Sequence, residues 1–285
     1  MPAEYVLTLS CPDRRGIVAA VAGCLAEQGG NIVESQQFGD ESTGLFFMRV
    51  HVVVDGASQP GAPGLHEALT AVGQRFEMDW ALHDLAVRPR VLIMVSRFGH
   101  CLNDLLFRHR TGALVAQIPA VVSNHEDFAE LVAGYGIPFH YLPVREAGKA
   151  EQERAVLDLV DRNAIDLVVL ARYMQVLSPH MCQKLAGRVI NIHHSFLPSF
   201  RGAAPYQQAF VRGVKLIGAT AHYVTASLDE GPIIEQEVAR VHHGMGPRQL
   251  AAVGRDVECV ALARAVQWHL QHRVLINGGK TVVFR

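Results

Sequence analysis

An asparagine and two histidines lie close together in the segment RVINIHHSFLPSFRGAAPY, residues 188–206. The apolar residues around Asn191 are typical of a buried strand, and a loop rich in Pro, Ser, Gly and Arg follows His194. Residues two apart on a strand point to the same face, so we expect the side chains of Asn191 and His193 to lie together. Polar side chains in a strand often only satisfy hydrogen bonds of the core, so this motif alone is a hypothesis.

A carboxylate follows the next predicted strand. Residues 216–224 (LIGATAHYV) read as that strand, and the turn LDEGP after it contains Asp229. We therefore expect Asn191, His193 and Asp229 to meet at one edge of a sheet. These are residue types that can stabilise an oxyanion, transfer a proton and orient a water molecule.

Nothing in the sequence favours a metal, nucleic acid or a membrane. The adjacent His193 and His194 point to opposite faces of a strand, and the five scattered cysteines show no metal-clip spacing, so we expect no bound metal. The same cysteines suggest no disulfide framework, so we expect reduced thiols and a cytoplasmic protein. The net charge of −1 gives no bulk attraction to nucleic acid. No secretory signal and no apolar run long enough to span a bilayer are visible.

The residues from 90 onward alternate between strand and helix signals. Apolar runs such as VLIMV and LVVLA are typical of strands covered on both faces, so the pattern predicts an α/β fold with a doubly wound, mostly parallel sheet. The expected strands are residues 90–96, 113–123, 137–144, 166–172, 188–194, 216–224 and 280–284. The expected helices are residues 100–110, 125–136, 152–163, 204–213 and 246–274.

The first 86 residues predict a separate βαββαβ domain, with residues 87–90 as a proline-containing linker and residues 91–285 as the second domain. The segment LSCPDRRGIVAAVAGCLAEQGGNI resembles an ACT domain, although Arg15 stands where the family's turn often has proline. The resemblance implies a regulatory module that pairs with another copy, and hence a homo-oligomer. It also implies either an amino-acid effector, for which we expect glycine or methionine, or dimerisation alone. The expected effector-binding residues are Asp13, Arg14, Gly16, Ile17, Asn31 and Ile32.

The segments NIHHSFLPSFRGAAPY and ATAHYVTASLDEGPII together resemble the folate-dependent formyltransferase family. The resemblance implies that Asn191, His193 and Asp229 are the catalytic residues. It also implies that ARYMQVL forms the cradle of a folate pterin ring, mainly through backbone groups. The expected substrate-binding residues are Arg172, Tyr173, Met174, Gln175, Val176, Leu177, His222, Leu228, Glu230 and Gly231.

Members of this family transfer the formyl group to different acceptors, so the acceptor of this chain has to be inferred from other residues. Gly99, His100 and Cys101 replace the small polar loop that holds a ribonucleotide phosphate, and no long basic segment for tRNA follows the core. Water is then the expected acceptor. With water as acceptor, the family resemblance implies hydrolysis of 10-formyltetrahydrofolate to tetrahydrofolate and formate, which would supply formate to purine synthesis and balance one-carbon pools. No cofactor beyond this substrate is expected. Transfer to an amine and a catalytically silent folate sensor are the alternatives.

Overall fold

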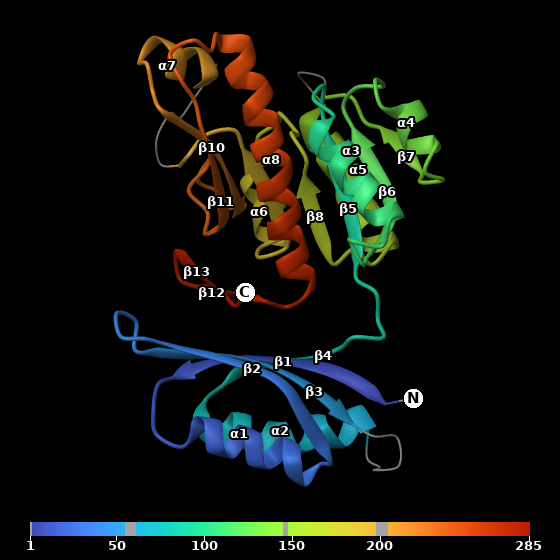
Figure 1. Cartoon of the computed structure of the whole chain (residues 1–285). Coiled ribbons are helices and arrows are strands. Elements are labelled where there is room, and N and C mark those ends of the chain that lie inside the picture. Colours follow the sequence, from blue (N-terminus) through green and yellow to red (C-terminus); the bar gives the residue numbers. More distant parts are fainter. Residues whose placement is uncertain (1, 55–60, 145–147, 198–204) are drawn as a thin grey trace. The chain divides into compact units, whose positions relative to one another are not determined.

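The computed structural model describes residues 2–54, 61–144, 148–197 and 205–285. The chain forms two compact units, each of which is seen in Figure 1. The first unit contains Met1–Arg88, Gln271–Asn277 and Val282–Arg285, and the second contains Pro89–Leu270 and Gly278–Thr281. The sequence assigned all of residues 91–285 to the second domain. The structure differs there, because most of the last 15 residues belong to the first unit.

The first unit is built on a four-stranded antiparallel sheet with the strand order β2-β3-β1-β4. The helices α1 and α2 lie on one face of this sheet (Figure 1). The order of elements is the predicted βαββαβ, which confirms the fold expected for this part of the chain. The elements are β1 (Ala3–Pro12), α1 (Ile17–Glu27), β2 (Gly30–Asp40), β3 (Leu45–Val54), α2 (Gly61–Phe76) and β4 (Asp79–Asp84).

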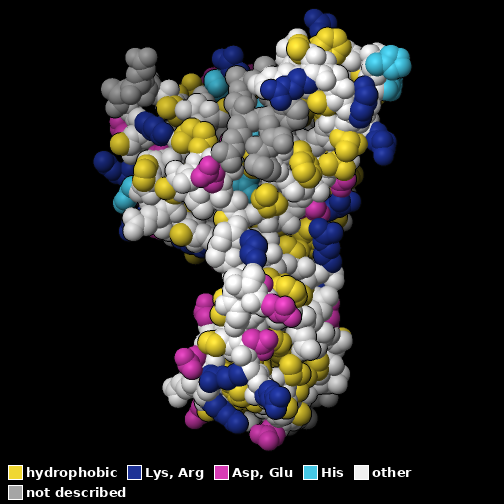
Figure 2. Space-filling view, turned by 90° about the vertical axis from the view of Figure 1, so that its left-hand side faces the viewer, with side chains coloured by type: hydrophobic (Ala, Val, Ile, Leu, Met, Phe, Trp, Pro, Cys, Tyr) yellow, Lys and Arg dark blue, Asp and Glu magenta, His cyan; other side chains and the backbone are white. Residues whose placement is uncertain are grey.

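One face of the sheet packs on the two helices. Leu7 and Leu9 of β1 and Met48 and Val50 of β3 are buried in a core that also contains Leu25 of α1. Residues two apart share a face of a strand, so the intervening side chains point to the opposite face. On the outer surface visible in Figure 2, Lys and Arg side chains of this unit lie among Asp and Glu side chains.

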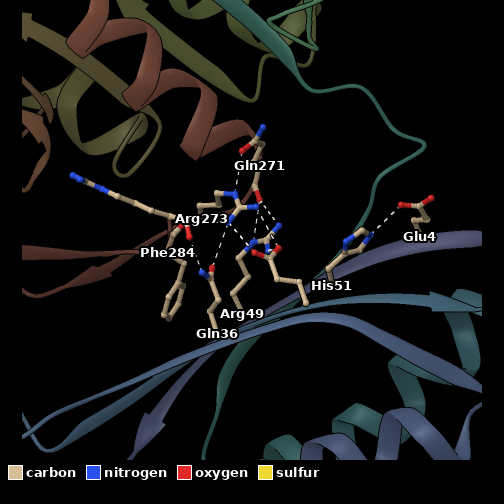
Figure 3. A network of polar contacts seen from close by, with 9 residues as sticks. Glu4, Gln36, Arg49, His51, Gln271, Arg273 and Phe284 are labelled. Carbon is tan, nitrogen blue, oxygen red and sulfur yellow. Dashed lines mark hydrogen bonds and ion pairs between the residues drawn. The ribbon is translucent and has the colours of Figure 1, made fainter.

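The opposite face carries a polar network that binds the end of the chain (Figure 3). The buried Arg49 lies 2.6 Å from a carboxylate oxygen of Glu34, and its guanidinium also donates to the backbone oxygen of Gln271. Arg273 binds the same Glu34 at 3.2 Å. Asn277 donates to Asp40 at 2.6 Å. These bonds explain why the last residues belong to the first unit. The segment forms the hairpin of β12 (Val274–Asn277) and β13 (Lys280–Val283).

The second unit contains a seven-stranded sheet with the order β11-β10-β9-β8-β5-β6-β7. The strands from β9 to β7 in this order run parallel, and β10 is antiparallel to both β9 and β11. The sheet is therefore mostly parallel, as predicted. The strands are β5 (Arg90–Val95), β6 (Gln117–Ser123), β7 (Phe139–Tyr141), β8 (Leu167–Leu170), β9 (Val189–His193), β10 (Leu216–Tyr223) and β11 (Ile233–Arg240).

Helices cover both faces of this sheet. On one face α8 packs on β9, β10 and β11 and contacts α3 and α7. On the other face, buried side chains of α5 and α6 pack on β5, β6 and β8. Chain order reverses between β5 and β8, so their carboxyl ends flank a topological switch point, where ligands bind in open α/β sheets. The helices are α3 (His100–Arg110), α4 (Ala129–Ala133), α5 (Lys149–Arg162), α6 (Pro179–Lys184), α7 (Pro205–Val211) and α8 (Pro247–Leu270).

Three elements of the second unit differ from the sequence-based expectation. The helix predicted for residues 125–136 is limited to α4, and it ends before Gly134 and Gly136. The short helix α6 was not predicted; Ser178 caps it by accepting a hydrogen bond from the backbone N–H of Met181. The edge strand β11 was not predicted either, because its polar residues follow a Gly-Pro pair that reads as a turn.

Candidate active site

Asn191 and His193 lie on β9 with their side chains on the same face, as the strand period requires. In the pairing of β9 with β10, His193 stands opposite Thr220 and Asn191 stands opposite His222. The Nδ2 atom of Asn191 lies 3.2 Å from the Nε2 atom of His222. The neighbouring strand therefore adds a second histidine to the predicted group.

Asp229 reaches this group by a route that differs from the expected one. Because β10 is antiparallel to β9, β10 ends opposite Ile190, near the start of β9 rather than at its carboxyl end. The loop of residues 224–232 then carries Asp229 back to His193. The Nδ1 atom of His193 lies 3.2 Å from Oδ2 of Asp229, so the structure brings the two predicted residues together.

The loop that holds Asp229 is tightly closed. The backbone N–H of Tyr223 donates to the oxygen of Pro232 at 2.9 Å. A Cβ atom on Gly231 would lie 1.7 Å from the Tyr223 oxygen, so only glycine allows this approach. Asp229 itself has a φ of 56°, in the left-handed region that aspartate tolerates better than most residues. Together these features fix the direction of the carboxylate.

The hydrogen bonds of His222 define its protonation. Its Nδ1 atom lies 2.9 Å from the backbone oxygen of Tyr223, which can only accept, so Nδ1 carries a proton. Burial lowers the pKa of His222, which favours the neutral ring with a free electron pair on Nε2. That electron pair accepts a hydrogen bond from Asn191. The second Nδ2 proton of Asn191 is then available to another acceptor.

The charge of the site is set by Asp229. The hydrogen bond from His193 lowers the pKa of the Asp229 carboxyl despite its partial burial, so the group is ionised at neutral pH. His193 is 6% exposed, and its Nε2 atom has no hydrogen-bond partner among the described residues. A buried nitrogen of this kind is suited to exchange a proton with a bound substrate.

The catalytic candidates line a cavity of about 260 Å³. Of the predicted substrate-binding residues, the segment from Arg172 to Leu177, His222 and Leu228 line it, whereas Glu230 and Gly231 do not. Several residues that line the cavity were not predicted from the sequence. Four of them form the segment VTAS directly after β10, and their position next to a predicted strand end could have indicated them. The missed residues are Leu170, Cys182, Ile192, His194, Val224, Thr225, Ala226 and Ser227.

The segment from Arg172 to Leu177 is anchored at both ends. The backbone N–H of Met174 donates to Oγ of Ser96 at 3.0 Å, and the N–H of Ser178 donates to Glu153 at 2.8 Å. Tyr173 is buried, which raises its pKa to about 12, and its hydroxyl accepts a hydrogen bond from Gln152. It therefore supports the loop from within the core.

Three apolar side chains that line the cavity are exposed to solvent. Met174, Val176 and Leu228 are 51%, 54% and 63% exposed. Apolar side chains at the rim of a cavity suit a ligand with a flat aromatic ring system. Residues 198–204 of the motif LPSFRGAAPY lie outside the described residues.

The predicted effector-binding residues are not gathered within one chain. Gly16, with a φ of 95°, precedes α1, and Ile17 is buried in the core. Arg14 bonds the backbone oxygen of Arg75 and the carboxylate of Glu77.

Asp13 and Asn31 lie toward opposite ends of the sheet. Pro12, which precedes Asp13, pairs with Leu45 of β3, whereas Asn31 pairs with Val53 of the same strand. Ile32 follows Asn31 on β2. Eight positions of β3 correspond to about 26 Å, so one copy of the chain does not assemble this set.

The two units correspond to two protein families. The family model for formyl transferases matches residues 89–266, and the ACT domain model matches residues 5–62. The formyl transferase model covers more than half of the chain, so the chain is a member of the formyl transferase family. The matching part is the second unit, which contains the Asn-His-Asp group. Among the described residues, no helix has both the length and the apolar character needed to cross a bilayer.

The relatives define the family more narrowly. The formyltetrahydrofolate deformylase of Corynebacterium sp. (strain P-1) is 52% identical, over 99% of this chain and 98% of the relative. That of Bacillus subtilis (strain 168) is 47% identical, over 98% and 93% of the two chains. A crystal structure of the deformylase from Burkholderia mallei ATCC 23344 has a TM-score of 0.95 and 53% identity over the whole of both chains. The chain belongs to the formyltetrahydrofolate deformylases.

More distant structures resemble the second unit. A glycinamide ribonucleotide transformylase from Symbiobacterium toebii has a TM-score of 0.67 and is 27% identical, over 71% of this chain and 97% of its own. The shared part is thus the formyl transferase fold, and one fold can carry different functions.

Proposed function

We propose that this chain is an enzyme that hydrolyses 10-formyltetrahydrofolate to tetrahydrofolate and formate. The observation that carries the proposal is the contact of His193 with Asp229 beside Asn191 in a cavity whose rim is apolar. Membership of the deformylase family supports the same reaction. The folate ring binds against the segment from Arg172 to Leu177, with Leu228 on the other side.

In the proposed mechanism, Asp229 orients a water molecule and accepts its proton as the water oxygen bonds to the formyl carbon. The carbonyl oxygen becomes an oxyanion and accepts a hydrogen bond from the free Nδ2 proton of Asn191. His193 donates an Nε2 proton to the folate nitrogen as the carbon–nitrogen bond breaks. Tetrahydrofolate and formic acid are released, and formic acid loses its remaining proton to solvent to give formate. The proton that Asp229 took from water passes to His193 and restores the starting state of the pair.

His222 acts through Asn191 in this mechanism. Its neutral ring accepts one Nδ2 proton of Asn191 and thereby fixes the direction of the other. His222 is thus a positioning residue rather than a catalytic one.

The experiment that separates hydrolysis from the alternatives measures both products. The purified chain is mixed with 10-formyltetrahydrofolate, and formate and tetrahydrofolate are quantified with and without an added amine such as glycinamide. Hydrolysis predicts equal amounts of both products without the amine. Transfer to an amine predicts turnover only when the amine is present, and a folate sensor predicts binding without turnover.

We further propose that the first unit binds glycine or methionine at an interface between two copies of the chain. Its ACT family supports an amino-acid effector, and the separation of Asp13 from Asn31 within one copy supports a site completed by a second. Mass measurement in solution, with formate release at increasing glycine or methionine, tests this. A monomer whose rate does not change with either amino acid contradicts it.

In the cytoplasm, such an enzyme would supply formate to purine synthesis and balance one-carbon pools.

A further inference from the structure

A second row of polar side chains crosses the sheet beside the catalytic group. In the pairing of β9 with β10, His193 stands opposite Thr220, and in the pairing of β10 with β11, Thr220 stands opposite Gln236. Residues that are directly opposite in an antiparallel pair share a face of the sheet. The three side chains therefore form one row on the face that also carries Asn191.

The hydroxyl of Thr220 is buried, and each of its hydrogen-bonding positions is used. It donates to the backbone oxygen of Ser195 at 3.0 Å and accepts from the backbone N–H of Leu197 at 3.1 Å. It also accepts from Nε2 of Gln236 at 3.0 Å. A hydroxyl offers one proton and two acceptor positions, so these three bonds fill it.

The amide of Gln236 supplies both of its protons to the same place. Its Nε2 atom donates at 3.0 Å to the hydroxyl of Thr220 and at 3.0 Å to the backbone oxygen of Leu197. A backbone oxygen only accepts, so the atom beside it is the amide nitrogen rather than the amide oxygen. This position thus uses a side chain with two protons on one nitrogen, and a carboxylate of the same shape has neither.

The segment that these side chains hold, residues 195–197, lies directly after the catalytic strand. Ser195 and Leu197 are buried, and their backbone groups accept and donate the bonds described above. Phe196 lies against β10, since a Cβ on Gly218 would be 3.2 Å from its ring. The chain that leaves β9 after His193 is thus fixed on this face of the sheet.

Thr220 and Gln236 act on the reaction only through this backbone. The lining of the described cavity includes His193 and His194 but neither of these two residues. The proposed reaction needs Nδ1 of His193 beside Asp229 and its Nε2 directed at the substrate. A small misplacement of reacting groups costs a large factor in rate, so a fixed segment after His193 contributes to the alignment.

We propose that Gln236 is a positioning residue, which together with Thr220 fixes residues 195–197 and so aligns the imidazole of His193 with Asp229 and the substrate. The proposal rests on the proposed hydrolysis for the role of His193. It also gives a role in the reaction to the edge strand β11, which lies beside β10 in Figure 1.

The test measures formate release at a temperature at which thermal unfolding shows each variant to be folded. Gln236→Met removes both donors at similar length, and Gln236→Glu keeps the shape of the side chain. Each should lower kcat about 10-fold and change KM less than about twofold. Thr220→Val should act in the same way, whereas Thr220→Ser, which keeps the hydroxyl, should recover most of the rate. Because both residues hold one segment, the double variant Thr220→Val/Gln236→Met should be no slower than the slower single variant.

The matched control is Gln183→Met, at an exposed position of α6, which should keep wild-type kinetics. A purely structural role of Gln236 predicts lower unfolding temperatures but a wild-type kcat in the folded variants, and this result would overturn the proposal. A raised KM with an unchanged kcat would also overturn it, because the amide would then serve substrate binding.

A second measurement does not depend on turnover. The imidazole signals of His193 in the NMR spectrum, identified by their loss in His193→Asn, should shift in Gln236→Met and stay in place in Gln183→Met. Unmoved signals in Gln236→Met would overturn the proposal. Failure of the hydrolysis proposal would appear separately, as no formate from wild type.

Discussion

The Nδ1 atom of His193 lies 3.2 Å from a carboxylate oxygen of Asp229, although the first residue ends β9 and the second lies in the loop after β10. This contact leaves the Nε2 atom of His193 as the nitrogen that can meet a substrate. It also places the carboxylate of Asp229 beside the imidazole.

Replacement of Asn191 by alanine should lower kcat about 10²-fold to 10³-fold, with a small effect on KM, because one oxyanion donor is lost. Steady-state rates of formate release measure this. Asn103→Ala, at an exposed position of α3, is the control and should keep wild-type kinetics. A mainly raised KM in Asn191→Ala would show that the amide binds substrate rather than the transition state.

Gly231→Ala should destabilise the second unit by at least about 2 kcal/mol, because the new Cβ would collide with the backbone oxygen of Tyr223. It should also lower kcat, because the loop that carries Asp229 must move. Denaturant unfolding and formate release measure the two effects. Gly23→Ala in α1, where a Cβ meets nothing within 4 Å, should be neutral or slightly stabilising. Unchanged activity in a folded Gly231→Ala chain would argue against the role of this loop.

Stability should depend on His194 at mildly acidic pH. Burial and the nearby Arg172 lower the pKa of His194 from 6.5 to about 4. The unfolded chain therefore binds a proton at a higher pH than the folded chain, so stability falls as pH decreases from about 6.5 to about 4. His194→Asn should reduce this fall in the unfolding temperature, whereas His243→Asn, at an exposed position, should not. Identical pH profiles for wild type and His194→Asn would contradict the prediction.

Glu34→Gln should destabilise the first unit by roughly 2 kcal/mol, because Arg49 stays buried and Arg273 loses the same partner. Unfolding in denaturant measures the loss. Glu41→Gln, at an exposed position in the turn after β2, should have little effect. Equal free energies of unfolding in the two variants would show that the network holding the chain end contributes little.

The order of the elements could be predicted because it depends on local patterns. The alternation in β1, the helical period of α1 and the apolar runs of β5 and β8 are all visible over short stretches of sequence. That the side chains of Asn191 and His193 lie on the same face of β9 follows from the strand period alone. Asp229 was predicted as well, from its place after the neighbouring strand and from the family resemblance.

The rest depends on contacts between distant residues. A strand's sequence does not show which way it runs beside its neighbour, so the antiparallel direction of β10 was missed. Gln236 lies on β11, a strand that was not predicted, and the backbone oxygen of Leu197 that it binds lies far from it in the sequence. Arg49, a charged residue within the apolar strand β3, could have indicated a polar partner on that face, but it was not used to predict where the chain's end binds.

The most direct test of the account compares formate release from 10-formyltetrahydrofolate by wild type, Asp229→Asn and Glu230→Gln without any amine acceptor. Asp229→Asn keeps the shape of the side chain but removes the charge that pairs with His193, whereas Glu230 does not line the cavity. We predict that wild type and Glu230→Gln release formate at similar rates and that Asp229→Asn is at least about 10²-fold slower. No formate from wild type, or equal rates for wild type and Asp229→Asn, would contradict the account.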